Sequence, residues 1–512
     1  MQLNIGILGD SPGWRLLLQQ EGVPFSHVGE EISANHFSVV GIGDSVDERE
    51  AEGVRGYLKK GGAVLCSARI FAQLASSHYA NMNVRYLLPE PDSDFEDAGL
   101  MDIHQKCRVP MNANTLKNER GATTCYVGEF LGGHVVALPF DIEAVMLDHR
   151  SAAKSFYSPT KRLPYEHVSV VSRGNVRRLI ARALEILHHR RSMPYAHVWY
   201  YPRDSESVFS FRVDTDRGTE EEIQQLYSVA GQHRVPMSWF IDAKSQAKMM
   251  PVFKRMEHQE LGVHCFDHRV YKEFERNLEN IGKAMEVMRL AGIEPKGFAA
   301  PFGKWNKGLA RAVKEHGLKY SSEFSYDYDN LPSTPYFEDN FLGVPQIPVH
   351  PICIGSLKRQ GYKDARMVQY FEFILRQKLA SRLPLIFYHH PKDGHHSVLE
   401  HVFNFIAGRR IPMMRFADYA EWWQERQTMN LRLSYEGNHL KTSGRPTSRD
   451  VFLRITKGDG TEALLELRPD IHLDAVKWES KPKPFVLPKD YLRCRKFNYR
   501  IPLTQTVNLL SR

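Results

Sequence analysis

The stretch Val208-Phe209-Ser210-Phe211-Arg212-Val213-Asp214-Thr215-Asp216 decides the expected fold of the central part of the chain. Its apolar and polar side chains alternate with the two-residue period of a β-strand, so the strand has two different faces. If the strand belongs to a barrel, its apolar face packs against helices and its polar face points inward. The strand then presents Asp214 and Asp216 on one side at its carboxyl end, where barrels build their sites.

A second predicted strand, at residues 261–263, leads into the histidine pair His264 and His268. Histidines four residues apart share one face of a helical turn, so both imidazoles can reach one ion. With one aspartate they form a two-histidine, one-carboxylate set that leaves coordination positions open. The spacing alone is weak evidence, because 23 histidines in 512 residues give about one such pair by chance. Two surface histidines and a helix-capping aspartate are the alternative interpretation.

The surrounding region alternates strands with helices, which favours a parallel α/β barrel. Further strands are predicted at 237–241, 297–300, 319–324, 346–349, 385–388 and 412–416. Helices are predicted at 219–233, 245–257 and 272–291. Thr219 and Glu222 have the spacing of a capping box at the start of the first of these helices.

Residues 196–427 resemble the polysaccharide deacetylase family, also called the NodB-homology or carbohydrate esterase 4 family. Four motifs follow in the family's order: Asp214-Thr215-Asp216, His264 to His268, Ala299-Ala300-Pro301-Phe302-Gly303, and the strand end Tyr388-His389-His390-Pro391. The third motif departs from the family, because the family's arginine is Ala299 here. The resemblance implies an irregular (β/α)7 barrel.

The resemblance also implies a role for each candidate residue. Asp216, His264 and His268 would bind a divalent metal, Asp214 would be the general base and His390 the general acid. Arg212, Pro301 and Phe302 are expected at the substrate. His389 is the alternative acid, but strand alternation lets only one of the two histidines face the site, and Pro391 favours His390. Zinc is the expected ion, with cobalt, iron and nickel as alternatives.

These residue types suit amide hydrolysis. A divalent ion lowers the pKa of bound water and polarises an acyl carbonyl. A carboxylate beside the ion can take the proton of the water, and an imidazolium can protonate the leaving amine. An amine expelled without that proton is a very poor leaving group, so the acid is a necessary part of the set.

Arg212 is the expected substitute for the missing arginine. In the family, the arginine of the third motif contacts the base aspartate. Arg212 lies two residues before Asp214 and therefore on the same face of the strand. A charged side chain inside a barrel is costly unless it is paired. The sequence therefore predicts an Arg212–Asp214 contact, and the alternative is an ion pair with an acidic residue of a neighbouring strand.

Two further domains flank the predicted deacetylase barrel at 193–429. Residues 1–192 are predicted to form an α/β domain with a parallel sheet, from strands at 3–8, 38–42 and 63–66 and a helix at 47–60. This order resembles glutamine amidotransferase-like or ThuA-like domains, but without an evident nucleophile, because Cys66 is interpreted as a strand residue. Short strands separated by glycine, proline and charged clusters predict a basic antiparallel β-domain at 430–512.

The charge and composition of the sequence restrict the kinds of partner that we expect the protein to bind. Residues 431–512 contain 16 Lys/Arg and 9 Asp/Glu, which is seven of the net +8 charges of the chain. This excess favours an anionic partner, such as an acidic glycan or the diphosphate of a lipid-linked sugar, and a solvated basic surface is the alternative. Nucleic acid is not expected, because the sequence has no recognisable nucleic-acid-binding motif.

The expected protein is a cytoplasmic metal-dependent N-deacetylase of an acylated amino sugar, saccharide, sugar nucleotide or lipid-linked sugar, acting in surface polysaccharide assembly. No apolar run approaches 18 residues, so no transmembrane segment is expected, although peripheral membrane contact is compatible with the sequence. The N-terminal residues lack the features of a signal peptide, and six scattered cysteines show no paired spacing.

Two alternatives come from other functional classes. Because Ala299 replaces the family's arginine, one alternative hypothesis is a non-catalytic carbohydrate-binding protein with a degenerate barrel. A non-haem iron oxygenase could use the same ligand set, but the strand–helix alternation disfavours it. The oligomeric state is not predicted.

Overall fold

The computed structural model describes residues 1–29, 31–43, 45–444 and 450–502. The chain forms two compact units, and each is assembled from segments that are distant in sequence. The first contains residues 1–148, 170–204 and 422–484, and the second contains 149–169, 205–421 and the chain from 485 onward. The consecutive domains at 1–192, 193–429 and 430–512 therefore differ from these units in their boundaries, and they stay predictions. Within the described residues, no helix is both long and apolar enough to cross a lipid bilayer.

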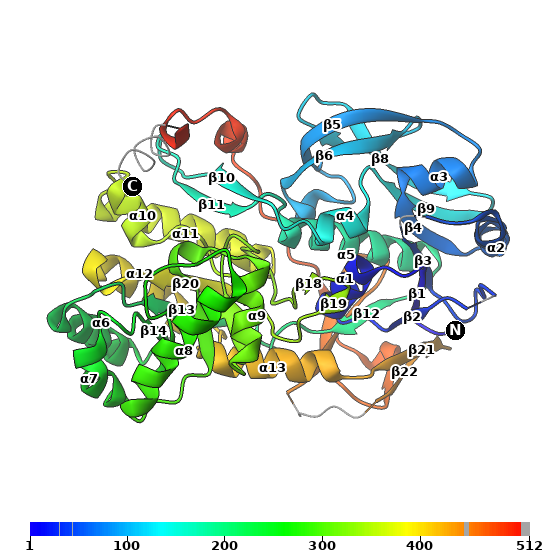
Figure 1. Ribbon diagram of the computed structural model, residues 1–512. Helices are drawn as coiled ribbons and strands as arrows, with labels where there is room; N and C mark the ends of the chain where they lie inside the picture. Colours follow the sequence, from blue (N-terminus) through cyan, green and yellow to red (C-terminus); the bar gives the residue numbers. More distant parts are fainter. Residues whose placement is uncertain (30, 44, 445–449, 503–512) are drawn as a thin grey trace. The chain divides into compact units, whose positions relative to one another are not determined.

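A curled sheet of six parallel strands forms the centre of the second unit, in the order β17-β16-β15-β14-β13-β20. The strands are β13 (Phe209–Asp214), β14 (Met237–Ile241), β15 (Glu260–Val263), β16 (Gly297–Ala299), β17 (Tyr320–Ser322) and β20 (Leu385–His389). The main helices of this unit are α6 (Glu220–His233), α7 (Met250–Lys254), α8 (Phe274–Leu290), α9 (Lys307–Glu315), α10 (Ile354–Arg359), α11 (Asp364–Ala380) and α12 (His396–Ala407). Figure 1 shows helices such as α6, α8 and α12 around the strands. The predicted α/β class of the central region is confirmed.

Two predicted strands, at 346–349 and 412–416, form no ladder. Gln346 makes only isolated bridges, while the amide of Ile347 donates to Ser321 and that of His350 donates to Ile386. This segment thus contacts both β17 and β20, but Pro345 and Pro348 lack the amide hydrogens that a ladder needs. The second segment runs into α13 (Phe416–Thr428). The sheet has six ladder strands, and the sevenfold barrel stays a prediction.

Strand β13 has the two faces that its alternation predicts. Phe209, Phe211 and Val213 belong to the apolar core of this unit, where the ring of Phe211 lies 5.3 Å from that of Phe403 on α12. Arg212 and Asp214 are also buried, but on the opposite face of the strand. The strand thus holds two ionisable side chains beneath the carboxyl end of the sheet.

The helix predictions hold where local signals are strong. Thr219 caps α6, and both hydrogen bonds of the capping box with Glu222 are present. The helix predicted at 245–257 is shorter, because it consists of the 3-10 turn η2 (Ala247–Met249) and the five-residue α7. Pro251 near the start of α7 has no amide hydrogen to donate to the preceding turn, which explains the break.

The first unit contains a nine-stranded mixed sheet: the three predicted strands are parallel, and the predicted parallel sheet is corrected only by four antiparallel strands at one side. Five strands are parallel: β2 (Phe25–His27), β1 (Ile5–Leu8), β3 (Val39–Ile42), β4 (Ala63–Ser67) and β9 (Gly133–Leu138). The sheet continues antiparallel through β8 (Thr123–Phe130), β7 (Thr115–Asn118), β5 (Tyr79–Leu88) and β6 (Met101–Pro110). No long helix separates consecutive strands from β5 to β9, and these five strands accordingly pair antiparallel with one another.

The helices of the first unit are α1 (Pro12–Glu21), α2 (Glu48–Lys59), α3 (Ala68–Leu74), α4 (Ile142–Met146) and α5 (Arg173–Arg190). The predicted helix at 47–60 is α2, capped by Asp47. Its apolar residues and those of α3 pack with the sheet in one core, which also contains Cys66. Burial raises the pKa of the Cys66 thiol well above its usual range, so its interpretation as a strand residue agrees with its surroundings.

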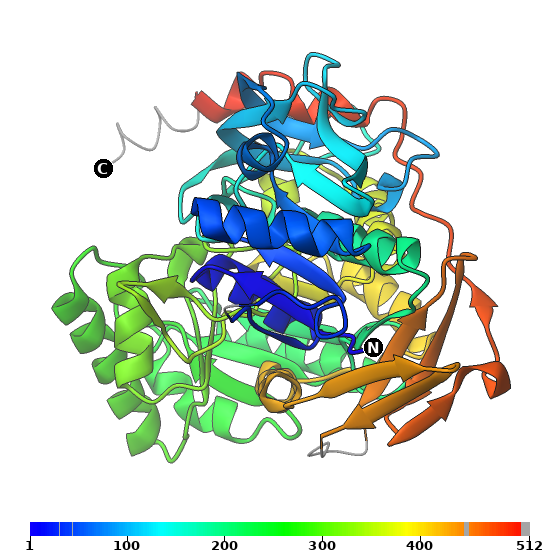
Figure 2. The ribbon, with the colours of Figure 1, turned by 90° about the vertical axis from the view of Figure 1, so that its right-hand side faces the viewer.

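The strands near the end of the chain are antiparallel, and Figure 2 shows them in orange. One sheet contains β12 (Tyr195–Val198), β23 (Phe452–Thr456), β24 (Thr461–Glu466) and β26 (Glu479–Ser480). Another contains β21 (Arg432–Glu436), β22 (His439–Ser443) and β25 (Asp470–His472). Because β12 precedes the curled sheet in sequence, the pairing of β12 with β23 joins two remote segments within the first unit.

The second unit also includes a hairpin of β10 (Ser151–Ser155) and β11 (Tyr165–Ser169). The hydroxyl of Tyr157 donates to Asp490 at 2.9 Å, and Arg493 in η6 (Tyr491–Arg495) donates to the carbonyl of Ser158 at 2.7 Å. The hairpin and the segment around η6 therefore pack together. A small ribbon, β18 (Tyr336–Phe337) with β19 (Asn340–Phe341), completes the strands of this unit.

His188 on α5 should make the stability of the protein depend on pH. Burial lowers its pKa to about 4, whereas an unfolded histidine titrates near 6.5. The unfolded chain therefore binds a proton first as the pH falls, and stability is lost between pH 6.5 and 4. From pH 7 to 5, the free energy of unfolding should fall by about 2 kcal/mol more in the wild type than in His188→Phe. Urea unfolding measures the free energy of unfolding of both proteins at both pH values.

The control is His78→Gln, because His78 is exposed. Equal losses of stability in wild type and His188→Phe would contradict the assignment to His188.

Candidate metal centre

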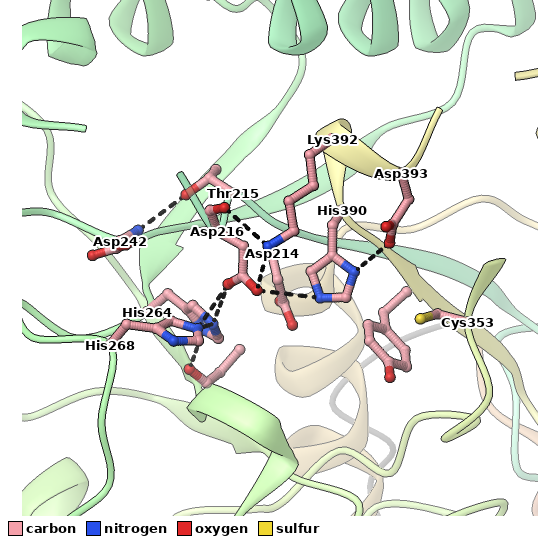
Figure 3. A network of polar contacts seen from close by, with 12 residues as sticks. Asp214, Thr215, Asp216, Asp242, His264, His268, Cys353, His390, Lys392 and Asp393 are labelled. Carbon is pink, nitrogen blue, oxygen red and sulfur yellow. Dashed lines mark hydrogen bonds and ion pairs between the residues drawn. The ribbon is translucent and has the colours of Figure 1, made fainter. Parts of the chain in front are cut away.

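Asp216, His264 and His268 converge at the carboxyl end of the curled sheet (Figure 3). The Oδ1 atom of Asp216 lies 3.2 Å from Nε2 of His264 and 2.8 Å from Nε2 of His268. The two Nε2 atoms lie 3.2 Å apart. One carboxylate oxygen and two imidazole nitrogens therefore surround a single point, as the ligands of one cation would.

The donor atoms fit a cation chemically as well as by distance. Nδ1 of His264 lies 2.7 Å from the carbonyl oxygen of Ala299, which can only accept a hydrogen bond, so Nδ1 holds the proton. In the neutral ring, Nε2 then directs a lone pair at the carboxylate of Asp216. This repulsive arrangement is relieved by a proton or by a metal ion, and the carbonyl of Ala299 orients the ring for metal binding.

The loop that holds the two histidines is not the helical turn that the sequence predicted. Residues 264–268 form a bend, in which Cys265 has a positive φ of 70°. Asn280 of α8 fixes this bend, because its Oδ1 accepts from the amide of Asp267 at 2.7 Å and its Nδ2 donates to the Asp267 carbonyl. Both imidazoles still reach Asp216. The two histidines with this spacing thus meet at Asp216, but a contact from another element sets their geometry.

Arg212 contacts Asp214 through two hydrogen bonds, as predicted. Nε donates to Oδ1 and Nη2 donates to Oδ2, both at 2.6 Å. Nη1 donates to the carbonyl of Ser322 at 2.9 Å. Burial opposes ionisation of Asp214, but the Arg212 charge outweighs it and holds the pKa of the carboxyl below its usual range. A two-point contact of this kind fixes both the charge and the orientation of the carboxylate.

Arg212 itself is fully buried. Its donors face Asp214 and backbone oxygens of the curled sheet, so its position favours a role through Asp214. The predicted contact of Arg212 with substrate stays a prediction.

His390 lies on the other side of Asp216. Its Nε2 is 3.6 Å from Oδ2 of Asp216, and its Nδ1 is 2.9 Å from Oδ2 of Asp393. Burial lowers the pKa of His390, but the hydrogen bond to Asp393 and the nearby Cys353 and Asp216 outweigh it, so the pKa lies well above its ordinary value. Protonated His390 is the form that a general acid requires.

The competing residue, His389, is fully buried at the end of β20. Burial lowers its pKa to about 3, which keeps the ring neutral. Among the described residues neither of its ring nitrogens has a hydrogen-bond partner. Strand alternation therefore separates the two histidines as expected, and the geometry favours His390.

Three residues of this region were not predicted from the sequence. Asp393, in η4 (Pro391–Asp393), orients His390. The thiol of Cys353, the residue before α10, is close to both. Lys392 extends its ammonium group to within 3.5 Å of Oδ2 of Asp216 and donates to the Asp216 carbonyl at 3.2 Å. A carboxylate three residues after a strand-end histidine was the one available signal, while Cys353 comes from a segment with no motif.

Phe302 and Pro301 occupy η3 (Pro301–Gly303), directly after β16. The Phe302 ring is 62% exposed and lies 4.9 Å from the ring of His268, edge to face. Its backbone has a positive φ of 58°, which is unusual for an aromatic residue. The Phe302 ring is thus exposed beside His268, whereas Pro301 is buried, and the expected contacts of both residues with substrate stay predictions.

Replacing Arg212 with methionine should leave the Asp214 carboxylate buried without its counter-charge. We expect the free energy of unfolding to fall by about 3–5 kcal/mol, as when one partner of a buried ion pair is removed. Turnover should fall as well, because the carboxylate loses its orientation, while metal content stays unchanged. Arg212→Lys is the matched variant, since it keeps the charge but cannot form the two-point contact. Wild-type turnover in Arg212→Met at a temperature where it is folded would contradict this role.

Comparison with known proteins identifies a family for the central region of the chain. Residues 211–321 match the family model described as "Polysaccharide deacetylase", which confirms the resemblance predicted for the central region. No curated protein matches the chain significantly.

Solved structures with the same kind of description are remote in sequence. A Mycobacterium smegmatis protein assigned as a polysaccharide deacetylase is 14% identical, with a TM-score of 0.39 over 44% of this chain and 93% of that one. A similar assignment from Pseudomonas aeruginosa PAO1 is 16% identical, with a TM-score of 0.37 over 43% and 92%. A family 4 carbohydrate esterase from Streptomyces lividans, solved with acetate, is 15% identical, with a TM-score of 0.29 over 41% and 92%.

Proposed function

We propose that the protein is a metal-dependent N-deacetylase that acts on an acylated amino sugar. The observation that carries this proposal is the cluster in which the donors of Asp216, His264 and His268 meet, with two candidate proton-transfer groups, Asp214 and His390, close by. The deacetylase match of residues 211–321 supports the same reaction class. Zinc suits the ligand set best, with cobalt, iron and nickel as alternatives.

Each residue has a defined task in this proposal. A divalent ion, when bound, would lower the pKa of its water and polarise the acyl carbonyl. Asp214 can accept a proton from the attacking water, since both its oxygens keep a lone pair free beyond the Arg212 contacts. His390 holds a proton on Nε2, which faces the centre, and donates it to the leaving amine. Asp393 keeps the ring of His390 in that orientation.

The contact between Arg212 and Asp214 favours an enzyme over a non-catalytic sugar-binding protein. The third-motif position is Ala299, a buried residue of β16 that cannot hold the base. Arg212 supplies the missing counter-charge from β13 instead. The alternative of a degenerate barrel rested on that missing arginine, so this contact weakens it.

A saccharide substrate is supported by Phe302, because an exposed aromatic ring beside the metal ligands can pack against a sugar. We include sugar nucleotides, lipid-linked sugars and short glycans among the substrates, and surface polysaccharide assembly as the process.

The proposal is tested by metal analysis of the purified protein combined with acetate release from a panel of N-acetylated sugars, sugar nucleotides and short glycans. We expect about one tightly bound divalent ion per chain and acetate release that a chelator abolishes. A protein that binds glycans by calorimetry but releases no acetate with any metal would be the non-catalytic alternative.

A further inference from the structure

Cys353, His390 and Asp393 form a second set of metal-binding side chains beside the first. One donor atom of each lies within 4.8 Å of the others. They come from three places in the chain: the residue before α10, the residue after β20, and η4. Figure 3 shows Cys353 and Asp393 on the side of His390 that faces away from His264 and His268.

The chemistry of this set suits a thiophilic divalent cation. Thiolate, imidazole and carboxylate are all ligands of zinc and cobalt. With bonds of about 2.0–2.3 Å, tetrahedral ligands lie roughly 3.4–3.7 Å apart. Donors within 4.8 Å of one another therefore need to shift relative to one another by about 1.4 Å at most, which is a small adjustment for three side chains.

Burial and charge agree with a bound cation. Cys353 is fully buried and Asp393 is 8% exposed, so charged forms of both are costly without a partner. A thiolate and a carboxylate together balance the charge of one divalent ion. The surroundings also hold the donors in place, because Ser356 donates its amide to the Cys353 sulfur at 3.4 Å and Lys358 donates to the Asp393 carbonyl at 3.0 Å.

We propose that Cys353, His390 and Asp393 bind a thiophilic divalent cation, and that this second cation inhibits the deacetylase by removing its proton donor. The binding half stands on the donor set alone, whereas the inhibitory half rests on the proposed function. Nδ1 of His390 faces Asp393, and Nε2 faces the first centre. A cation on Nδ1 takes the place of the Nδ1 proton, and the thiol proton of Cys353 is also released to solvent. The ring then keeps only its Nε2 proton, whose transfer would leave an imidazolate, so His390 no longer acts as an acid.

Cobalt titration of the full chain tests the binding half, because a cobalt–thiolate bond absorbs in the near ultraviolet. We expect wild-type protein to bind two equivalents of Co²⁺. The thiolate band should arise only from the equivalent that binds to the set containing Cys353. Cys353→Ser should lose that band and one equivalent, and Cys494→Ser is the matched control that should keep both. Cys353→Ala and thermal melting guard against misfolding. A wild-type band that persists in Cys353→Ser, or no band at saturating cobalt, would overturn the proposal.

His264→Ala separates this proposal from the function of the first centre. This variant should lose the first equivalent and keep the thiolate band, since none of the second set is changed. If the band vanishes in His264→Ala, the second site does not exist by itself, although the deacetylase proposal stands. If the band persists but wild type and His264→Ala bind equal amounts of metal, Asp216, His264 and His268 do not bind a metal ion. The proposal for Cys353, His390 and Asp393 then still stands.

Excess zinc tests the inhibitory half. For each protein, the rate of acetate release is measured with one equivalent and with several equivalents of Zn²⁺, and the ratio of these two rates is compared between proteins. We expect at least a tenfold loss in wild type and in Cys494→Ser, and little loss in Cys353→Ser. Equal inhibition of Cys353→Ser and wild type would show that zinc inhibits elsewhere and would refute this half.

Discussion

Acetate release by the Asp214→Asn protein is expected to fall by about 10²–10⁴-fold, the usual contribution of a general base, while metal content stays at the wild-type level. Asparagine has nearly the shape of aspartate, but it has no charge and no basic oxygen for the proton of a water molecule. Asp214 is not among the three converging ligands, so the metal should remain. Parallel measurement of metal content and acetate release on one preparation checks both expectations.

The structure adds a second effect to this variant. Arg212 is fully buried and makes a two-point contact with Asp214, so the amide leaves a guanidinium without its counter-charge. Stability should therefore fall as well, and activity must be measured well below the unfolding transition. Asp242→Asn is the matched control, because Asp242 is a buried carboxylate of the same unit outside the proposed catalytic set. Near wild-type acetate release by Asp214→Asn would exclude this residue as the base.

The His264→Ala protein should lose both tight metal binding at the first centre and all measurable deacetylation. Only Asp216 and His268 would remain as protein ligands, and two ligands hold a divalent ion far more weakly than three. The Ala299 carbonyl orients the His264 ring toward Asp216, so the alanine variant loses an oriented ligand. Metal content after dialysis and acetate release at fixed zinc measure the two losses.

His268→Ala should lose metal as well, because its Nε2 makes the closer approach to Asp216. His258→Asn is the control for non-specific binding, because His258 is exposed and lies outside the site. Unchanged tight binding in both His264→Ala and His268→Ala would show that these histidines do not hold the metal. The deacetylase proposal would then lose its central observation.

Local sequence patterns determined the parts of the site that depend on one strand and its end. Alternation in β13 placed Phe209 and Phe211 in the core and Arg212 beside Asp214, because a strand directs every second side chain to the same face. The same rule separated His389 from His390. These relations follow from the two-residue period of a β-strand, which can be recognised in the sequence alone.

The tertiary structure decided what depends on contacts between remote segments. The bend at 264–268 replaced a helical turn because Asn280 of α8 binds its backbone. The first sheet became mixed because the strands after β5 lack crossover helices. Cys353 reaches His390 and Asp393 only when two separate segments meet. Such contacts depend on how side chains from distant parts of the chain pack together, and the free energy of that packing cannot be read from a local sequence pattern. The faces of a strand and the types of potential metal ligand, by contrast, are properties of the local sequence.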